Sequence, residues 1–160
     1  MKGRTDSARR SVDAPPSAVY RALVDPSALV QWLPPQGMTG QIHVYEPRPG
    51  GRFEMTLTYD QADTVGKTAT NQDVIEAEFV MLSPDQKIVQ RVVFKSDDPQ
   101  LAGTMIMSWF LRAVDSGTEI RVVCENVPAG IDKQDHAEGL RSSLTNLANF
   151  LQNEPRDRSI

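Results

Sequence analysis

The sequence has little of what most metal sites and nucleophilic active sites are built from. It contains one cysteine, Cys124, and two histidines, His43 and His136, far apart in the chain. A single cysteine cannot form an internal disulfide bond, and these residues supply too few ligands for a typical metal site. We therefore expect no metal and no cofactor. The lone thiol suits a reducing compartment, so we expect a cytoplasmic protein.

Long apolar runs and a strong excess of either charge are also missing. No segment approaches the ~18 apolar residues that a membrane-spanning helix needs. No apolar stretch follows Arg9 and Arg10, so we expect no secretory signal. The net charge is −4 with both signs interspersed, which argues against a nucleic-acid partner. The composition indicates a single soluble domain, residues 1–160, with a hydrophobic core of its own.

Residues 61–68, QADTVGKT, end like a phosphate-binding loop. That motif requires glycine at its first position, where this chain has Gln61. We reject the motif and expect a solvated, mobile loop over residues 60–73.

What the sequence does contain is an ordered series of strand and helix patterns. Residues 5–12 form a possible first strand, and residues 14–26 have the spacing of a short helix. A second short helix begins after Asp25, a good N-cap, with Pro26 in its first turn, and runs to Trp32. The prolines that follow end it, and Gly-Met-Thr-Gly then predicts a turn.

A long β region follows. Strands are predicted over residues 41–45, 52–60, 74–82, 87–95, 103–114 and 118–127. The turns between the last four are short, so we expect an antiparallel meander. A helix over residues 133–153 places Leu140, Leu144, Leu147 and Leu151 in one stripe, with His136 one turn earlier. The fold class is α+β: an antiparallel sheet of six or seven strands curves around this helix.

Three segments resemble one family. PSAVYRALVDPSALVQWLPP (residues 16–35), EPRPGGRFEMTLTY (46–59) and DHAEGLRSSLTNLANFL (135–151), in this order, are similar to the SRPBCC superfamily of START, polyketide-cyclase and birch-pollen-allergen relatives. Within it the chain resembles the branch named after the activator of the heat-shock-protein-90 ATPase. The resemblance implies a helix-grip fold, with an elongated cavity between the long helix and the concave sheet and the helix pair at one end.

The resemblance does not imply one activity, because members bind lipids, hormones or polyketides, a minority catalyse reactions, and some act through protein contacts. One residue departs from the branch, which often has a bulky aromatic after the glycine of its C-terminal helix. Here Leu140 follows Gly139, which could widen the cavity or change what it accepts.

The stretch QWLPPQGMTG (residues 31–40) places Trp32, Leu33 and Met38 at the end of this implied cavity. Trp32 either completes the core as a plug, which we favour, or lines the entrance as a gate. The proposed cavity lining is Trp32, Met38, Met55, Tyr59, Phe79, Trp109, Leu140, Leu144 and Leu147. Five of the methionines would make the interior adaptable to variable apolar ligands, although methionine also fills ordinary cores.

Three residues are candidate polar anchors. His136 borders the helix stripe, and Glu78 and Arg91 lie in strands that are otherwise apolar. A buried carboxylate or histidine could bind a polar group or move a proton. The alternative for Glu78 and Arg91 is a solvent-facing cross-strand pair, which we favour. Cys124 alternates with Val122 and Ile120, so we expect a small core residue rather than a nucleophile paired with His136.

Three functions remain open. The leading one is binding of an apolar, lipid-like or aromatic small molecule in the cavity, without catalysis. The second is a cyclase- or hydrolase-like enzyme that uses acid–base chemistry there. The third is a co-chaperone-like role with a protein partner, and a homodimer is possible with any of them.

Overall fold

The computed structural model describes residues 3–60, 72–94 and 98–153. This part of the chain holds seven strands in one antiparallel sheet and three helices. The elements are β1 (Arg4–Val12), α1 (Pro16–Val24), α2 (Pro26–Trp32), β2 (Met38–Tyr45), β3 (Arg52–Tyr59), β4 (Gln72–Ser83), β5 (Lys87–Phe94), β6 (Gly103–Val114), β7 (Gly117–Val127) and α3 (Lys133–Asn153). The QADTVGKT segment and most of the predicted loop lie outside the described residues.

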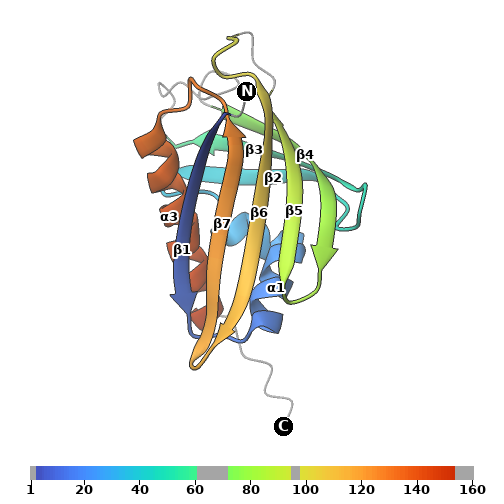
Figure 1. Ribbon diagram of the computed structural model, residues 1–160, viewed down its shortest axis with the longest axis vertical. Coiled ribbons are helices and arrows are strands. Elements are labelled where there is room, and N and C mark those ends of the chain that lie inside the picture. The colour runs from blue at the N-terminus through green and yellow to red at the C-terminus, as the bar shows by residue number, and fades with distance from the viewer. Residues whose placement is uncertain (1–2, 61–71, 95–97, 154–160) are drawn as a thin grey trace.

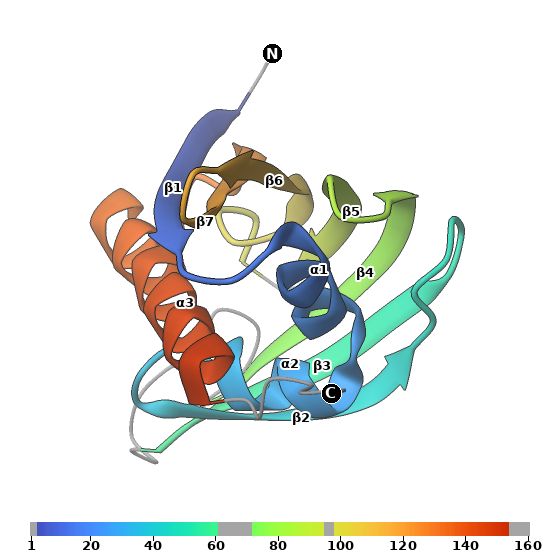
Figure 2. The same cartoon turned by 90° about the horizontal axis from the view of Figure 1, so that it is seen from below.

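The strand order is β1-β7-β6-β5-β4-β3-β2, so each strand from β2 to β6 pairs with the next strand in the chain. The predicted meander is confirmed, and β1 is added beside β7 at the far edge (Figure 1). Seen from below, the sheet bends around the helices, with α3 near β1 and the short helices inside the curve (Figure 2). The predicted α+β helix-grip arrangement is therefore confirmed.

The predicted turn at residues 37–40 is wrong in its extent. The turn lies at Gln36 and Gly37, where the backbone N–H of Met38 donates to the carbonyl oxygen of Pro35 at 3.1 Å. Gly37 has a φ of +90° there, a conformation that glycine adopts at little cost. Met38 then pairs directly with Tyr59 in β3. Strand β2 consequently begins three residues before the predicted position.

Helix α2 begins and ends where the sequence predicts. The Asp25 carboxylate accepts hydrogen bonds from the backbone N–H and the hydroxyl of Ser27, at 3.0 and 2.8 Å, and so caps α2. The Trp32 side chain is completely buried, and its indole N–H donates to the carbonyl oxygen of Ala22 at 2.9 Å. Trp32 therefore binds the two short helices together.

The segment after α2 is fastened to α3 by three hydrogen bonds. The Ser143 hydroxyl donates to the carbonyl oxygen of Leu33 at 2.6 Å, and the Asn146 amide donates to that of Pro34 at 2.9 Å. The backbone N–H of Gln36 donates to the Ser142 hydroxyl at 2.9 Å. These bonds hold the helix pair against the long helix at one end of the molecule.

Buried apolar residues of α3 and of the concave sheet face share one core. Leu144 and Leu147 on α3 are almost fully buried, as are Ile120, Val122 and Cys124 on β7. None of the helices in the described part of the chain is both long enough and apolar enough to cross a bilayer.

Candidate ligand-binding cavity

A cavity of about 910 Å³ lies between α3, the helix pair and the concave face of the sheet. Its lining begins at Leu23 of α1 and at Leu29 and Trp32 of α2, follows β2 to β6, and reaches Ile131 before α3. The first turns of α3 complete the lining at the other end. This volume is in the upper part of the range of ~300–1,000 Å³ that is typical of small-molecule sites.

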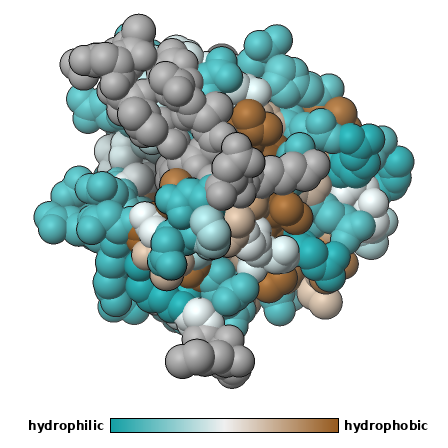
Figure 3. All heavy atoms as spheres, turned by 90° about the horizontal axis from the view of Figure 1, so that it is seen from above, coloured by the Kyte–Doolittle hydropathy of each residue, from teal (hydrophilic) through white to brown (hydrophobic). Residues whose placement is uncertain are grey.

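Figure 3 shows the molecule from above, at the end where α3 begins. Hydrophobic side chains gather in the middle of this face, and hydrophilic side chains surround them. An apolar interior with a polar rim is the usual composition of a small-molecule pocket.

Six of the proposed site residues line this cavity. They are Trp32, Met38, Tyr59, Trp109, Leu140 and His136. The rings of Trp32 and Trp109 meet edge to face, with 5.6 Å between their centroids, so both tryptophans of the chain lie at the cavity wall. Trp32 is completely buried and hydrogen-bonded to Ala22, which is what the plug interpretation, a residue that completes the core, predicts for it.

Four proposed wall residues need correction, because Met55, Phe79, Leu144 and Leu147 are buried without being part of the described lining. The Met55 methyl packs over Gly40, where the absence of a side chain leaves room for it. Phe79 lies behind the wall, packed against the rings of Tyr45 and Phe53. Leu144 and Leu147 fill the helix–sheet core. A residue on the same face of a strand or helix as the lining residues therefore does not necessarily reach the cavity.

The proposed anchors Glu78 and Arg91 also need correction. They lie opposite each other on β4 and β5, and Arg91 Nη1 is 2.5 Å from Glu78 Oε1. Their side chains are 47% and 48% exposed, and neither lines the cavity. The pair is the solvent-facing cross-strand ion pair that the sequence offered as the alternative.

We predict that the double substitution Glu78→Gln with Arg91→Gln leaves ligand binding unchanged. Because exposed ion pairs are solvated, the loss of stability should be at most about 1 kcal/mol. Urea unfolding and equilibrium dialysis with an apolar probe check this. A loss of probe binding in the folded double variant would return these residues to the site.

Gln90 lines the cavity from β5 but was not among the site residues predicted from the sequence. Ile88, Gln90, Val92 and Phe94 alternate along this strand and all face the cavity. Gln90 is the polar member of this otherwise apolar face, and that pattern was visible in the sequence. Arg91, the residue chosen instead, has the opposite parity and therefore lies on the outer face.

The carboxylates of the lining were also missed. Asp73 of β4 is buried and accepts a hydrogen bond from the Tyr59 hydroxyl at 3.3 Å. Asp132, Asp135 and Glu138, at the beginning of α3, are exposed at the rim. Asp132 also accepts from the backbone N–H of Asp135 at 3.0 Å and so caps the helix.

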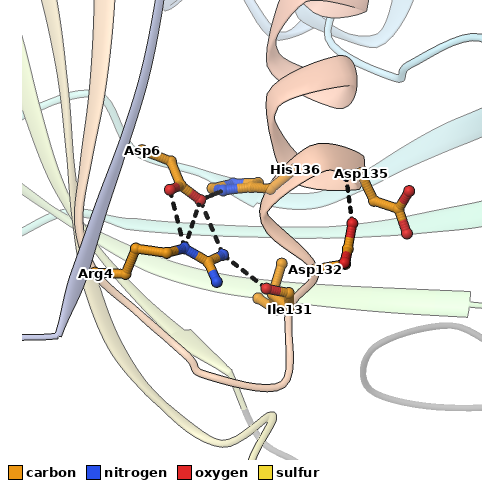
Figure 4. Close-up of polar contacts among 6 residues, drawn as sticks. All are labelled: Arg4, Asp6, Ile131, Asp132, Asp135 and His136. Atoms are coloured by element: carbon orange, nitrogen blue, oxygen red, sulfur yellow. Dashed lines mark hydrogen bonds and ion pairs between the residues drawn. The ribbon is translucent and has the colours of Figure 1, made fainter.

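His136, which lines the cavity, contacts a buried carboxylate. Its Nδ1 lies 2.7 Å from Oδ2 of Asp6, a buried residue on β1 (Figure 4). Arg4 donates to the same carboxylate, with Nε 2.9 Å from Oδ1 and Nη2 2.9 Å from Oδ2, and also to the carbonyl oxygen of Ile131 at 2.7 Å. An ionised carboxylate can only accept, so Nδ1 of His136 carries a proton.

Opposing effects determine the pKa of Asp6. Burial alone would raise it, but the hydrogen bonds from Arg4 and His136, together with their charges, hold the Asp6 pKa below its ordinary value of 3.8. The carboxylate is therefore ionised at neutral pH and fixes the orientation of the His136 ring.

Cys124 and His43 do not contribute chemistry to this site. Cys124 is completely buried, and burial, with a smaller contribution from the charge of Asp6, raises the pKa of its thiol to about 12. A protonated thiol is a poor nucleophile. His43 is exposed on β2 and shares a hydrogen bond with the Thr56 hydroxyl at 2.9 Å. Across residues 3–60, 72–94 and 98–153, His, Cys, Asp and Glu form no group of three able to hold a metal ion.

Comparison with known proteins agrees with this architecture. The model of the family described as "Activator of Hsp90 ATPase homolog 1-like protein" matches residues 13–152. Protein CV1439 from Chromobacterium violaceum is 29% identical, with a TM-score of 0.82 over 92% of this chain and 96% of that one.

More distant solved structures share the fold. Protein MLL2253 from Mesorhizobium loti is 19% identical, with a TM-score of 0.73 over 95% of this chain and 99% of that one. Protein NE0264 from Nitrosomonas europaea is also 19% identical, with a TM-score of 0.72 over 94% and 96% of the two chains. No curated protein matches the sequence.

Proposed function

Because this chain belongs to the Activator of Hsp90 ATPase homolog 1-like family, whose fold commonly binds ligands, we propose that it binds an apolar small molecule in the cavity between α3 and the sheet. The observation that carries the proposal is the cavity itself: about 910 Å³, walled mainly by apolar and aromatic side chains. Well-packed protein interiors contain few voids larger than a water molecule. A space of this size in a 160-residue chain is therefore best explained by an occupant.

The construction of the cavity supports a binding role. The end of the cavity at the helix pair is fixed, since Trp32 is completely buried and hydrogen-bonded to Ala22, and residues 33–36 are hydrogen-bonded to α3. A preformed wall loses little conformational entropy when a ligand enters. Met38, Met105 and Met107 add adaptable thioether surface to the lining.

The test begins with native mass spectrometry of the freshly purified protein, followed by denaturation and analysis of released small molecules. We expect a stoichiometric apolar compound or, for the emptied protein, binding of naphthalene in equilibrium dialysis. Absence of both a co-purified compound and naphthalene binding would overturn the proposal.

Substitutions at Gly139 test whether this binding occurs in the cavity. Gly139 lines the cavity, and a Cβ atom built on it meets the Pro35 ring at 4.0 Å, an ordinary contact. We predict that Gly139→Phe weakens naphthalene binding about tenfold or more, because the ring fills space that the probe needs. The matched control Gly139→Ala should keep binding and gain about 0.5–1 kcal/mol of stability from its helix propensity. Equal probe affinity in the two folded variants would contradict a site in this cavity.

Acid–base catalysis in the same cavity is a second candidate, favoured by the pair of His136 and Asp6. The short contact between Nδ1 and the carboxylate resembles the way an orienting acid holds a catalytic histidine. Its test is turnover of activated esters by the wild-type protein and by His136→Gln. Hydrolysis that depends on His136 would support an enzyme. Equal rates for both proteins would exclude this residue as the base.

A protein partner, the third function considered, has weaker support from the described surface. The exposed large hydrophobic residues there are Val80 and Met81, adjacent on β4. Two neighbouring side chains form a small patch, whereas interaction surfaces usually expose several hundred Å² of apolar area.

A further inference from the structure

Two polar side chains in the cavity wall have no hydrogen-bond partner in the described protein. Gln90 is 8% exposed and Trp109 is 4% exposed, and both line the cavity. Neither the Gln90 carboxamide nor the Trp109 indole N–H takes part in any hydrogen bond among the described residues. Polar groups buried to this degree nearly always have partners, so each such group requires an explanation.

Other polar groups in the same wall are satisfied by the protein. The Trp32 indole N–H donates to Ala22, the Tyr45 hydroxyl to the carbonyl oxygen of Leu23, and the Ser143 hydroxyl to Leu33. In the described part of the chain, no side-chain nitrogen or oxygen that is fully enclosed lacks a partner. The free groups of Gln90 and Trp109 are therefore not sealed within protein, and the open space beside them is the cavity.

The strand register places Gln90 and Trp109 near each other on one face of the sheet. In the β5–β6 ladder, Ile88 is opposite Trp109 and Gln90 is opposite Met107. Gln90 and Trp109 are thus diagonal neighbours on the concave face, a separation that long and aromatic side chains can span. Together they offer two kinds of donor, an amide NH₂ and an indole N–H, and one amide acceptor.

The charges of the lining restrict which ligand group can enter. Asp73, Asp132, Asp135 and Glu138 are acidic, and none of the described lining residues is a lysine or an arginine. Nδ1 of the one histidine there, His136, faces the Asp6 carboxylate. A buried carboxylate needs a paired charge, and like charges repel it at the rim. A cation could meet the exposed carboxylates at the rim, but it could not accept from the Trp109 N–H inside.

We propose that the cavity selects an uncharged apolar molecule with a carbonyl-type hydrogen-bond acceptor, held by the Gln90 amide and the Trp109 indole N–H, and rejects carboxylates such as fatty acids. This inference rests on the proposed binding function and specifies its ligand class. Gln90 and Trp109 provide the attraction, and the acidic rim provides the discrimination against anions.

Three probes with one ring system separate these effects: naphthalene, 2-acetylnaphthalene and 2-naphthoate, measured by equilibrium dialysis at neutral pH. For the wild-type protein we expect 2-acetylnaphthalene to bind about fivefold more tightly than naphthalene, as one or two net hydrogen bonds allow. We expect 2-naphthoate to bind about tenfold or more weakly than 2-acetylnaphthalene.

Substitutions then test which residues cause the preference for 2-acetylnaphthalene. Gln90→Leu, which keeps the side-chain size, should reduce the advantage of 2-acetylnaphthalene over naphthalene. Trp109→Phe should act in the same direction. Gln41→Leu is the matched control, because Gln41 lies in a strand, is exposed and is not part of the lining. Asp135→Asn with Glu138→Gln should narrow the gap between 2-acetylnaphthalene and 2-naphthoate.

The outcomes separate this inference from the proposed function. If naphthalene binds but Gln90→Leu and Trp109→Phe both leave the ratio unchanged, the inference is wrong and the binding function stands. Equal affinity for 2-naphthoate and 2-acetylnaphthalene overturns the charge selection. If none of the three probes binds the emptied wild-type protein, the inference is wrong, and if no apolar compound co-purifies either, the binding function fails as well.

Discussion

Replacement of Trp32 by alanine is expected to destabilise the protein by about 3–5 kcal/mol. Trp32 is completely buried, bonds α2 to α1 through Ala22, and packs edge to face on Trp109. Alanine removes the largest fully buried side chain of the core and leaves a void beside an existing cavity. The carbonyl oxygen of Ala22 also loses its indole donor. Urea unfolding followed by far-UV circular dichroism measures the change.

Two further variants separate the causes of this loss. Trp32→Phe keeps an aromatic ring but removes the indole N–H, so its cost should be clearly smaller, at about 1–2 kcal/mol. Val80→Ala is the surface control, because Val80 is 43% exposed, and its effect should remain within about 0.5 kcal/mol. A loss below about 1 kcal/mol for Trp32→Ala would contradict the plug and revive the gate interpretation.

Replacement of Asp6 by alanine is the second large effect, at about 3 kcal/mol. The carboxylate is buried and receives hydrogen bonds from Arg4 and His136. Without it, the Arg4 guanidinium and the His136 ring lose their shared acceptor at the junction of β1 and α3. The expected result is a lower free energy of unfolding at neutral pH, measured in urea.

The same contacts predict a pH dependence. Because the folded state holds the Asp6 pKa below its ordinary value of 3.8, the ionised carboxylate stabilises the fold at pH values above 3.8. This contribution is lost as the pH falls through the lowered value, when Asp6 becomes protonated. Asp6→Asn should therefore lose less stability than the wild type on acidification below about pH 4.

Asp115→Asn provides the control, because Asp115 is exposed in the turn between β6 and β7. This variant should follow the wild-type acid transition. Parallel stability curves for the wild type and Asp6→Asn between about pH 5 and pH 2 would show that Asp6 does not contribute as described.

The sequence by itself determined the order and type of the elements. Apolar alternation in residues 52–59 and the leucine stripe of α3 identified a strand and a helix, because local periodicity is imposed by backbone geometry. Asp25 and Pro26 marked the beginning of α2 for the same local reason. Parity along a strand could also have found Gln90, since Ile88 and Val92 flank it on one apolar face.

Only the tertiary structure decided which buried residues reach the cavity. Phe53 and Met55 have the same parity on β3, yet Phe53 lines the cavity and the Met55 methyl packs over Gly40. The difference arises from the curvature of the sheet and the position of the neighbouring strand. The apolar periodicity along one strand gives no information about the curvature or about the neighbouring strand.

The contact between Asp6 and His136 also could not be predicted from local sequence patterns. Asp6 lies near the beginning of the chain and His136 near its end, and they meet because β1 pairs with β7 at the far edge of the sheet while α3 packs against β1. A long-range contact of this kind depends on strand order. Strand order follows from the packing of the whole sheet around the helix. The residue types and their spacing predict only the individual strands and helices.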